Sequence, residues 1–116
     1  MINEAVATTD GSLVCIEKGE AIRRSISYKV RWCDAEQFAI NGYDAFYGFI
    51  AGMLAGNYDI KEIFVDGILK IGGRDYNEFG VMLEKINQLV LDDTTVVFTV
   101  SADESELSDN VKQFIK

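Results

Sequence analysis

The stretch IFVDGILKI, residues 63–71, decides the fold that the sequence predicts. It places Asp66 and Gly67 between two mainly apolar runs. An Asp-Gly pair in this setting is a strong signal of a two-residue β-hairpin, because glycine readily adopts the positive φ that such turns require. The stretch therefore predicts two antiparallel strands that meet at Asp66 and Gly67.

The residues before this hairpin predict three more strands. Apolar and polar side chains alternate with a period of two over residues 25–33, which is typical of a half-buried strand. An earlier strand is predicted over residues 12–18. A short third strand is predicted over residues 36–40, where Phe38 and Ile40 share the expected core face. Together the segments predict an antiparallel meander.

Three helices and one further strand complete the prediction. NGYD, residues 41–44, predicts a helix start, because Asn and Asp side chains accept hydrogen bonds from the free amides of a first turn. Residues 75–78 resemble a capping box that opens a helix to about Leu91. Residues 94–101 are rich in β-branched side chains and predict a well-buried strand. Residues 101–104 then open a last helix.

The predicted element order is therefore β-β-β-α-β-β-α-β-α. This order indicates a single α+β domain over residues 1–116, with a mostly antiparallel sheet and about three helices packed on it.

The first predicted helix carries three glycines in an uncharged run, residues 45–56. At 1.5 Å per residue this run spans about 18 Å, well short of the ~30 Å hydrocarbon core of a membrane. Gly48 and Gly52 lie on one face and form a groove that another backbone can approach closely. Gly56 is interpreted as a left-handed C-terminal cap. Two occupants of the groove stay open, a segment of the same chain or a second copy in a homodimer.

Acidic residues are in excess and concentrate toward the C-terminus. The chain has 19 Asp and Glu against 11 Lys and Arg, a net charge of −8, which disfavours nucleic acid and anionic membranes as partners and favours a basic protein. No basic residue lies between Lys85 and Lys112. That interval contains the candidate partner-binding residues Asp92, Asp93, Asp103, Glu104, Glu106 and Asp109. The alternative is a solvated face that keeps the protein soluble.

The usual catalytic residues are scarce. The chain has no histidine, the commonest general base and a frequent metal ligand. Cys15 and Cys33 lack the spacing of a zinc site or a redox motif, so we expect free thiols. Residues 72–74, Gly-Gly-Arg, lack the pattern of a phosphate-binding loop. We expect a protein without enzymatic activity, metal or other cofactor. The N-terminal residues lack the pattern of a secretory signal, which predicts a cytoplasmic location.

One resemblance rests on two stretches. SYKVRWCDAEQFAINGYDAFYGFIAGMLA, residues 27–55, contains two predicted strands that lead into an apolar helix, and the predicted hairpin IFVDGILKI follows it. This layout resembles that of small acidic bacterial immunity proteins encoded beside polymorphic or contact-dependent toxins. The resemblance implies direct inhibition of a basic, nuclease-type toxin, and it transfers no binding residue. A homo-oligomeric structural or regulatory module, assembled through Gly48 and Gly52 or through a sheet edge, is the alternative hypothesis.

Overall fold

A four-stranded parallel sheet forms the centre of the protein. The computed structural model describes residues 12–20, 23–26, 29–57, 59–90 and 94–115. Within these residues the strands are β1 (Ser12–Glu17), β2 (Arg31–Asp34), β3 (Ile60–Asp66) and β4 (Thr95–Phe98), in the spatial order β2-β1-β3-β4. All three strand pairings are parallel.

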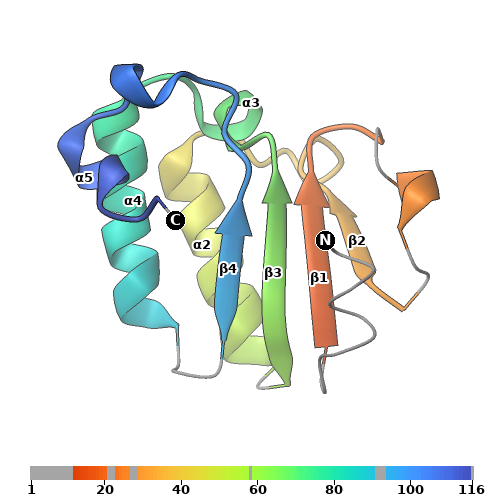
Figure 1. Ribbon diagram of the computed structural model, residues 1–116. Helices are drawn as coiled ribbons and strands as arrows, with labels where there is room; N and C mark the ends of the chain where they lie inside the picture. The colour runs from red at the N-terminus through yellow and green to blue at the C-terminus, as the bar shows by residue number, and fades with distance from the viewer. Residues whose placement is uncertain (1–11, 21–22, 27–28, 58, 91–93, 116) are drawn as a thin grey trace.

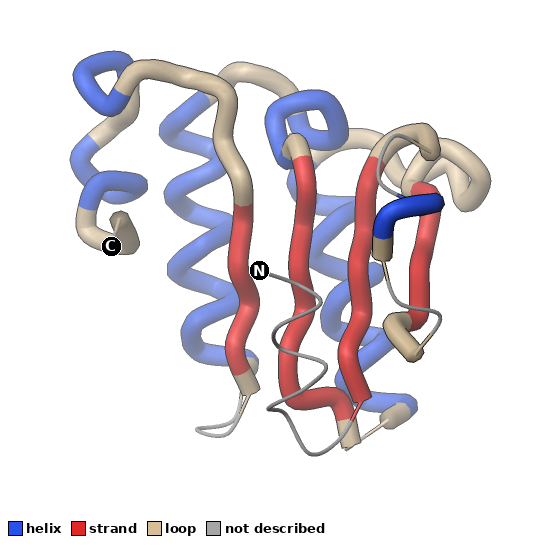
Figure 2. The backbone as a smooth tube through the Cα atoms, turned by 45° about the vertical axis from the view of Figure 1, so that its right-hand side comes forward, coloured by secondary structure: helices blue, strands red, loops and turns tan. Residues whose placement is uncertain are grey.

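Helices connect the strands and cover one face of the sheet. α2 (Tyr43–Gly56) joins β2 to β3, and α3 (Ile68–Gly72) with α4 (Tyr76–Leu89) joins β3 to β4. Figures 1 and 2 show α2 and α4 side by side behind the sheet. The shorter elements are the 3-10 turns η1 (Arg23–Ser25) and η2 (Glu104–Glu106) and the helix α5 (Asp109–Lys112), which packs against α4.

The main core lies between the sheet and these helices. Val14 of β1 and Ile63 of β3 pack in one buried cluster with Phe46 of α2 and Phe79 of α4. Alternate residues of β1 and β3 point to the opposite face, where Leu13, Cys15, Val30 and Phe64 form a second buried cluster. The two central strands are therefore buried on both faces, as in other parallel sheets.

The predicted antiparallel sheet is wrong, and the Asp66-Gly67 pair explains why. Gly67 has the expected positive φ of 70°, with a ψ of 49°, but it caps the start of α3 and does not form a hairpin turn. Residues 68–72 therefore form one helical turn in place of a second strand. The turn buries Ile68, Leu69 and Ile71 together, whereas an alternating strand would direct neighbouring residues to opposite faces.

Other strand predictions are wrong in extent or in type. Of the strand predicted over residues 25–33, residues 31–33 belong to β2, and residues 27–28 lie outside the described residues. Residues 36–40 form a turn in which Ala39 has a φ of 55°. Ile40 is buried as expected, whereas Phe38 is 57% exposed. The strand predicted as well buried over residues 94–101 is β4, a partly buried edge strand.

Helix positions were predicted better than strand pairing. α2 begins after Gly42 as expected, although no side chain caps it. Gly56 is the last residue of α2, but its φ is not positive, so the predicted left-handed cap is wrong. In α4 the predicted cap is confirmed, because the Asp75 carboxylate accepts a hydrogen bond from the Glu78 amide at 3.1 Å. The predicted last helix is two short elements, η2 and α5.

Two glycines at the helices provide a matched test of packing. A Cβ atom on Gly72 would lie 2.3 Å from the ring of buried Tyr43, whereas a Cβ atom on Gly48 would meet no described atom within 4 Å. We expect Gly72→Ala to lower the free energy of unfolding by about 1–3 kcal/mol through overpacking. Gly48→Ala should raise it by up to about 1 kcal/mol through helix propensity. Urea denaturation measures both, and equal stability of the two variants would contradict this packing.

Candidate functional site

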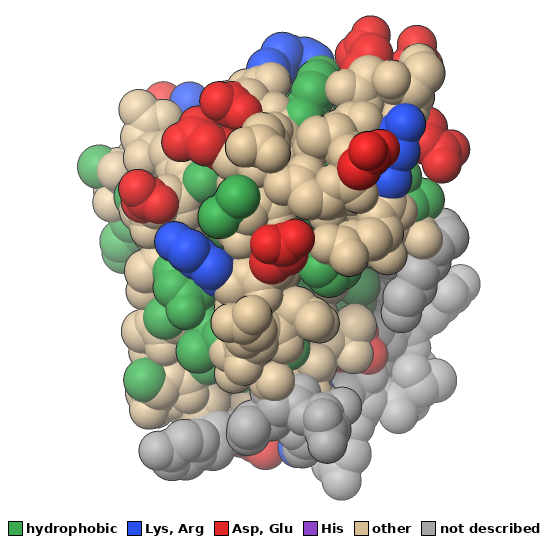
Figure 3. All heavy atoms as spheres, turned by 90° about the vertical axis from the view of Figure 1, so that its left-hand side faces the viewer, with side chains coloured by type: hydrophobic (Ala, Val, Ile, Leu, Met, Phe, Trp, Pro, Cys, Tyr) green, Lys and Arg blue, Asp and Glu red, His purple; other side chains and the backbone are tan. Residues whose placement is uncertain are grey.

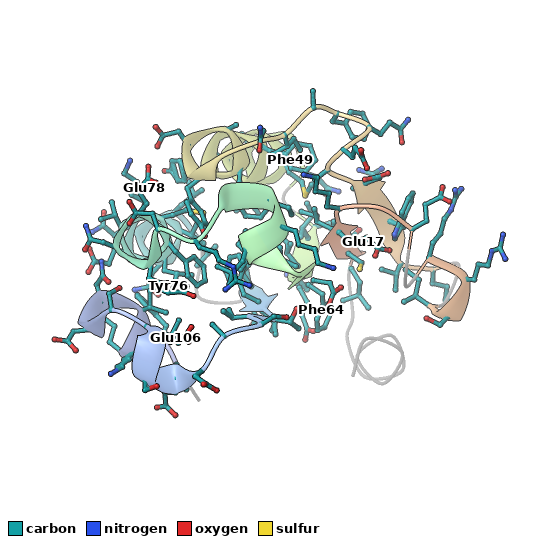
Figure 4. All side chains as sticks on the ribbon, turned by 90° about the horizontal axis from the view of Figure 1, so that it is seen from above. Glu17, Phe49, Phe64, Tyr76, Glu78 and Glu106 are labelled. Atoms are coloured by element: carbon teal, nitrogen blue, oxygen red, sulfur yellow. The ribbon has the colours of Figure 1, made fainter. Side chains whose placement is uncertain are left out.

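The strand order changes direction between β1 and β3, and the carboxyl ends of these two strands lie side by side. β2 lies on one side of β1 and β3 lies on the other, so the connections that leave β1 and β3 run in opposite directions. This order is that of the first four strands of flavodoxin-like doubly wound sheets, and ligands of open parallel sheets bind beyond the carboxyl ends at such a switch point. Figure 4 views the molecule from this end of the sheet.

At the end of β3, a hydroxyl group links two elements. The Thr99 side chain donates a hydrogen bond to Asp66 Oδ1 at 2.9 Å and accepts one from the Gly67 amide at 2.9 Å. The Asp66 carboxylate is half-buried and directly precedes the left-handed residue that starts α3. These bonds join the carboxyl ends of β3 and β4, and they position Asp66 at the switch point.

At the end of β1, Glu17 is buried to 2% exposure. Its Oε2 accepts a hydrogen bond of 2.7 Å from the indole nitrogen of Trp32 on β2. The Arg23 guanidinium lies over the Trp32 ring, 4.7 Å from its centroid, and pairs with Glu20 at 3.2 Å. Glu17 thus binds the indole nitrogen and Arg23 covers a face of the ring. These two contacts hold Trp32 of β2 against the end of β1.

The remaining polar groups of this end also bind to the backbone. Asp34 Oδ1 at the end of β2 accepts hydrogen bonds from the amides of Gly19 and Glu36, both at 2.9 Å. The Lys18 ammonium donates to the Lys70 carbonyl at 3.3 Å. In the part of the chain that the structure describes, no three Cys, Asp or Glu side chains converge as a metal site. The strand-end polar residues therefore act as connectors of loops.

Sequence reasoning missed Glu17, Asp66 and Thr99 as a set. Each lies at or just after the carboxyl end of a strand, at a polar position that ends an apolar run. That signal has meaning only in a parallel sheet, where these ends meet at one edge. The antiparallel prediction assigned Asp66 to a hairpin, which would have directed the neighbouring strand ends away from each other.

The two cysteines are free, as predicted, and face opposite sides of the sheet. Cys15 pairs in register with Trp32 and lies in the second cluster, whereas Cys33 pairs with Ile16 and packs toward the helices. Burial, with the nearby carboxylates of Glu17 and Asp66, raises the pKa of Cys15 from 9.0 to about 12. The thiol is therefore protonated at neutral pH and is a poor nucleophile.

Four of the predicted partner-binding acids follow β4 on one segment. We call residues 103–109 the acidic segment; it includes η2 and the start of α5. Its carboxylates are exposed, and none has a described Lys or Arg nitrogen within 4.0 Å: Asp103, Glu104, Glu106 and Asp109. Asp92 and Asp93 lie outside the described residues.

One member of the acidic segment is tied to α4 and its preceding loop. The Tyr76 hydroxyl donates to Glu106 Oε2 at 3.3 Å and accepts from the Arg74 guanidinium at 3.2 Å. In Figure 4 the labelled Tyr76, Glu78 and Glu106 gather at one end of the molecule, far from Glu17. Figure 3 shows acidic side chains spread over the upper part of this side of the molecule, with a few Lys and Arg between them. The surface is predominantly acidic without being a single patch.

Gly48 and Gly52 lie on an exposed face of α2. Neither glycine has a described atom within 4 Å of the position of a Cβ atom, so no described segment of the chain fills the groove. Beside this face, Phe38 stacks on Phe49 with a ring-centroid distance of 6.2 Å. The exposed glycines thus lie beside a stacked aromatic pair in which Phe38 is exposed and Phe49 is partly buried.

Comparisons with models of known families, with curated proteins and with solved structures found no match. Among the described residues, no helix has both the length and the apolar character needed to cross a bilayer.

The raised pKa of Cys15 predicts a loss of stability in alkali. Between pH 9 and 12 the unfolded chain loses the Cys15 proton while the folded chain keeps it, so stability falls as the pH rises through this window. Cys15→Ala should therefore show a shallower decline in the free energy of unfolding from pH 9 to 12. Denaturant titrations across this range provide the measurement, with Gly48→Ala, which removes no titratable group, as control. Parallel declines for wild type and Cys15→Ala would contradict the assignment.

Proposed function

We propose that this chain is a non-enzymatic binding protein that recognises a basic protein, and that it is an immunity protein for a basic, nuclease-type toxin in the bacterial cytoplasm. The observation that carries the proposal is the acidic segment, whose four exposed carboxylates have no described cation within 4.0 Å. Charges that are not neutralised within the molecule are available to another molecule.

The electrostatics support this kind of partner. Isolated exposed ion pairs contribute little to folding, so an excess of unpaired surface acids gives no stability. The same acids create a negative potential that accelerates encounter with a cationic protein and fixes its orientation. An inhibitor of a nuclease needs this property, because the substrate groove of a nuclease is itself positive.

The carboxyl end of the sheet has a supporting role in this proposal. Glu17, Asp34 and Asp66 hold strand ends and loops through hydrogen bonds. They give the domain a connected frame from which the acidic segment projects. The proposal assigns no catalytic step and no cofactor to these residues.

The proposal predicts a position-dependent effect of charge. Asp103→Asn with Glu104→Gln removes two charges from the acidic segment, and Glu36→Gln with Asp44→Asn removes two charges from exposed positions elsewhere. Association with the basic protein encoded beside this chain should slow about threefold to tenfold for the first pair and much less for the second. Stopped-flow kinetics at low and physiological salt measure both rates. Equal rates for the two pairs, or rates that do not depend on salt, would refute the proposed surface.

Self-association through α2 is the second candidate function. The observation that favours it is the exposed, uncharged face of Gly48 and Gly52, next to the stacked rings of Phe38 and Phe49. An open helix face with the exposed Phe38 ring near it suits a two-fold contact, in which each copy presents both.

A larger side chain in the groove separates the two candidates. Gly48→Leu places bulk where the monomer has space, so the folded monomer should keep its stability, whereas a dimer formed through this face should dissociate at least about tenfold more readily. Sedimentation velocity over a concentration series gives the answer, with Gly48→Ala as the conservative variant. A wild-type chain that stays monomeric at all concentrations would eliminate this candidate.

A further inference from the structure

We infer that the outer edge of β4 is a docking site for an extended segment of a partner protein, which adds to the sheet as a fifth strand. The docking segment is a stretch in which apolar and polar residues alternate, with basic residues beside it. The basic character rests on the proposed function, whereas the position of docking rests on the backbone of β4.

The hydrogen-bonding groups of β4 establish which residues face outward. β4 is the last strand of the order β2-β1-β3-β4. The Thr99 amide donates to the Val65 carbonyl at 2.9 Å, so the odd-numbered residues 95, 97 and 99 bond to β3 in this parallel ladder. The amide and carbonyl groups of Val96 and Phe98 therefore point away from β3. In the described chain no other strand pairs with them.

The strand β4 itself lacks the charges, proline and bulge that protect many sheet edges. Natural edge strands commonly carry charged residues, proline or a bulge, each of which discourages further pairing. β4 reads TVVF, with no charge and no proline, and its register with β3 is regular. The opposite edge strand, β2, reads RWCD and has charged residues at both of its ends. The two edges of the sheet thus differ, and only β4 is chemically suited to pairing.

The side chains of β4 specify the sequence pattern of the docking segment. Val96 and Phe98 pack toward the helix-covered core, and Val97 packs toward the second cluster. All three are only partly buried. Thr95 and Thr99, on the same face as Val97, are exposed, so that face is more polar than the face of Val96 and Phe98. The residues of an added strand should therefore alternate between apolar and polar side chains.

The charge beside the edge selects the partner. Figures 1 and 4 place η2 and α5 on the side of β4 that faces away from β3. The acidic segment on these elements carries four carboxylates and no basic residue. Lys or Arg next to the docking segment would complement these charges, whereas a second copy of this chain would bring another molecule of net charge −8 to the same edge. The occupant is therefore a basic protein segment.

The experiment uses the full chain and a short synthetic peptide of alternating valine and threonine, flanked on both sides by lysines. Amide hydrogen exchange, followed residue by residue by NMR, should show protection of Val96 and Phe98 when the peptide binds, because their amides gain partners. A peptide of the same core flanked by glutamates should bind at least about tenfold more weakly. A lysine peptide with a central proline should also lose binding, because it cannot complete the ladder.

A pair of variants tests the same edge from the protein side. Val96→Pro removes one outward amide while leaving the inward ladder to β3 intact, and Val96→Ala keeps that amide. We expect Val96→Pro to bind the lysine peptide at least about tenfold more weakly than Val96→Ala. The exchange data on the wild-type chain stand independently should Val96→Pro fail to fold.

The outcomes distinguish the inference from the proposed function. Lysine-dependent binding with protection confined to the acidic segment would overturn docking at β4 and leave the basic partner in place. Protection of Val96 and Phe98 by both flanked peptides alike would support edge docking and overturn its basic specificity. No protection of either amide at millimolar peptide would overturn the inference.

Discussion

The parallel pairing of β1 with β3 is the constraint on which the rest of the structure depends. Residues from Ser12 to Glu17 pair along β3 up to Asp66, and the two strands are covered on both faces. Parallel neighbours cannot be joined by a tight turn, so each connection must cross the sheet. α2 and the α3–α4 pair are those crossings, and their buried faces form the main core. The same pairing brings the ends of β1 and β3 together at one edge.

Local features of the sequence predicted helices well and strand direction badly, for a physical reason. The capping residue Asp75 and the glycine before α2 act within a few residues, so their effects can be identified without knowledge of the fold. Strand direction depends on partners distant in the chain. Gly67 adopts a positive φ in either a hairpin or a helix start, and only the joint burial of Ile68, Leu69 and Ile71 decides between them. The nearly continuous apolar runs of β1 and β3 were the available signal of parallel strands buried on both faces.

The candidate site was only partly predictable for a related reason. Charge counts along the chain identify the acidic segment, because an interval without Lys or Arg is a property of the sequence alone. The link between Asp66 and Thr99 joins residues 33 positions apart, and it exists only because β3 and β4 are parallel neighbours. Glu17 and Trp32 are likewise brought together by the pairing of β1 with β2. Contacts that depend on strand order could not be predicted once that order was wrong.

Carboxylates at the carboxyl end of the sheet and carboxylates of the acidic segment differ in how strongly they are bound within the molecule. At the carboxyl end of the sheet the carboxylates of Glu17, Asp34 and Asp66 accept hydrogen bonds from an indole, from amides and from a hydroxyl, which offsets the cost of their burial. On the acidic segment the carboxylates remain in water, where their repulsion is small and their field extends over about one Debye length, ~8 Å at physiological salt. β4 connects the two regions, since Thr99 at its end binds Asp66 and the acidic segment follows a few residues later. A segment that pairs with β4 would lie on the side of this strand where η2 and α5 carry the acidic segment. Shape and charge would then select the same partner.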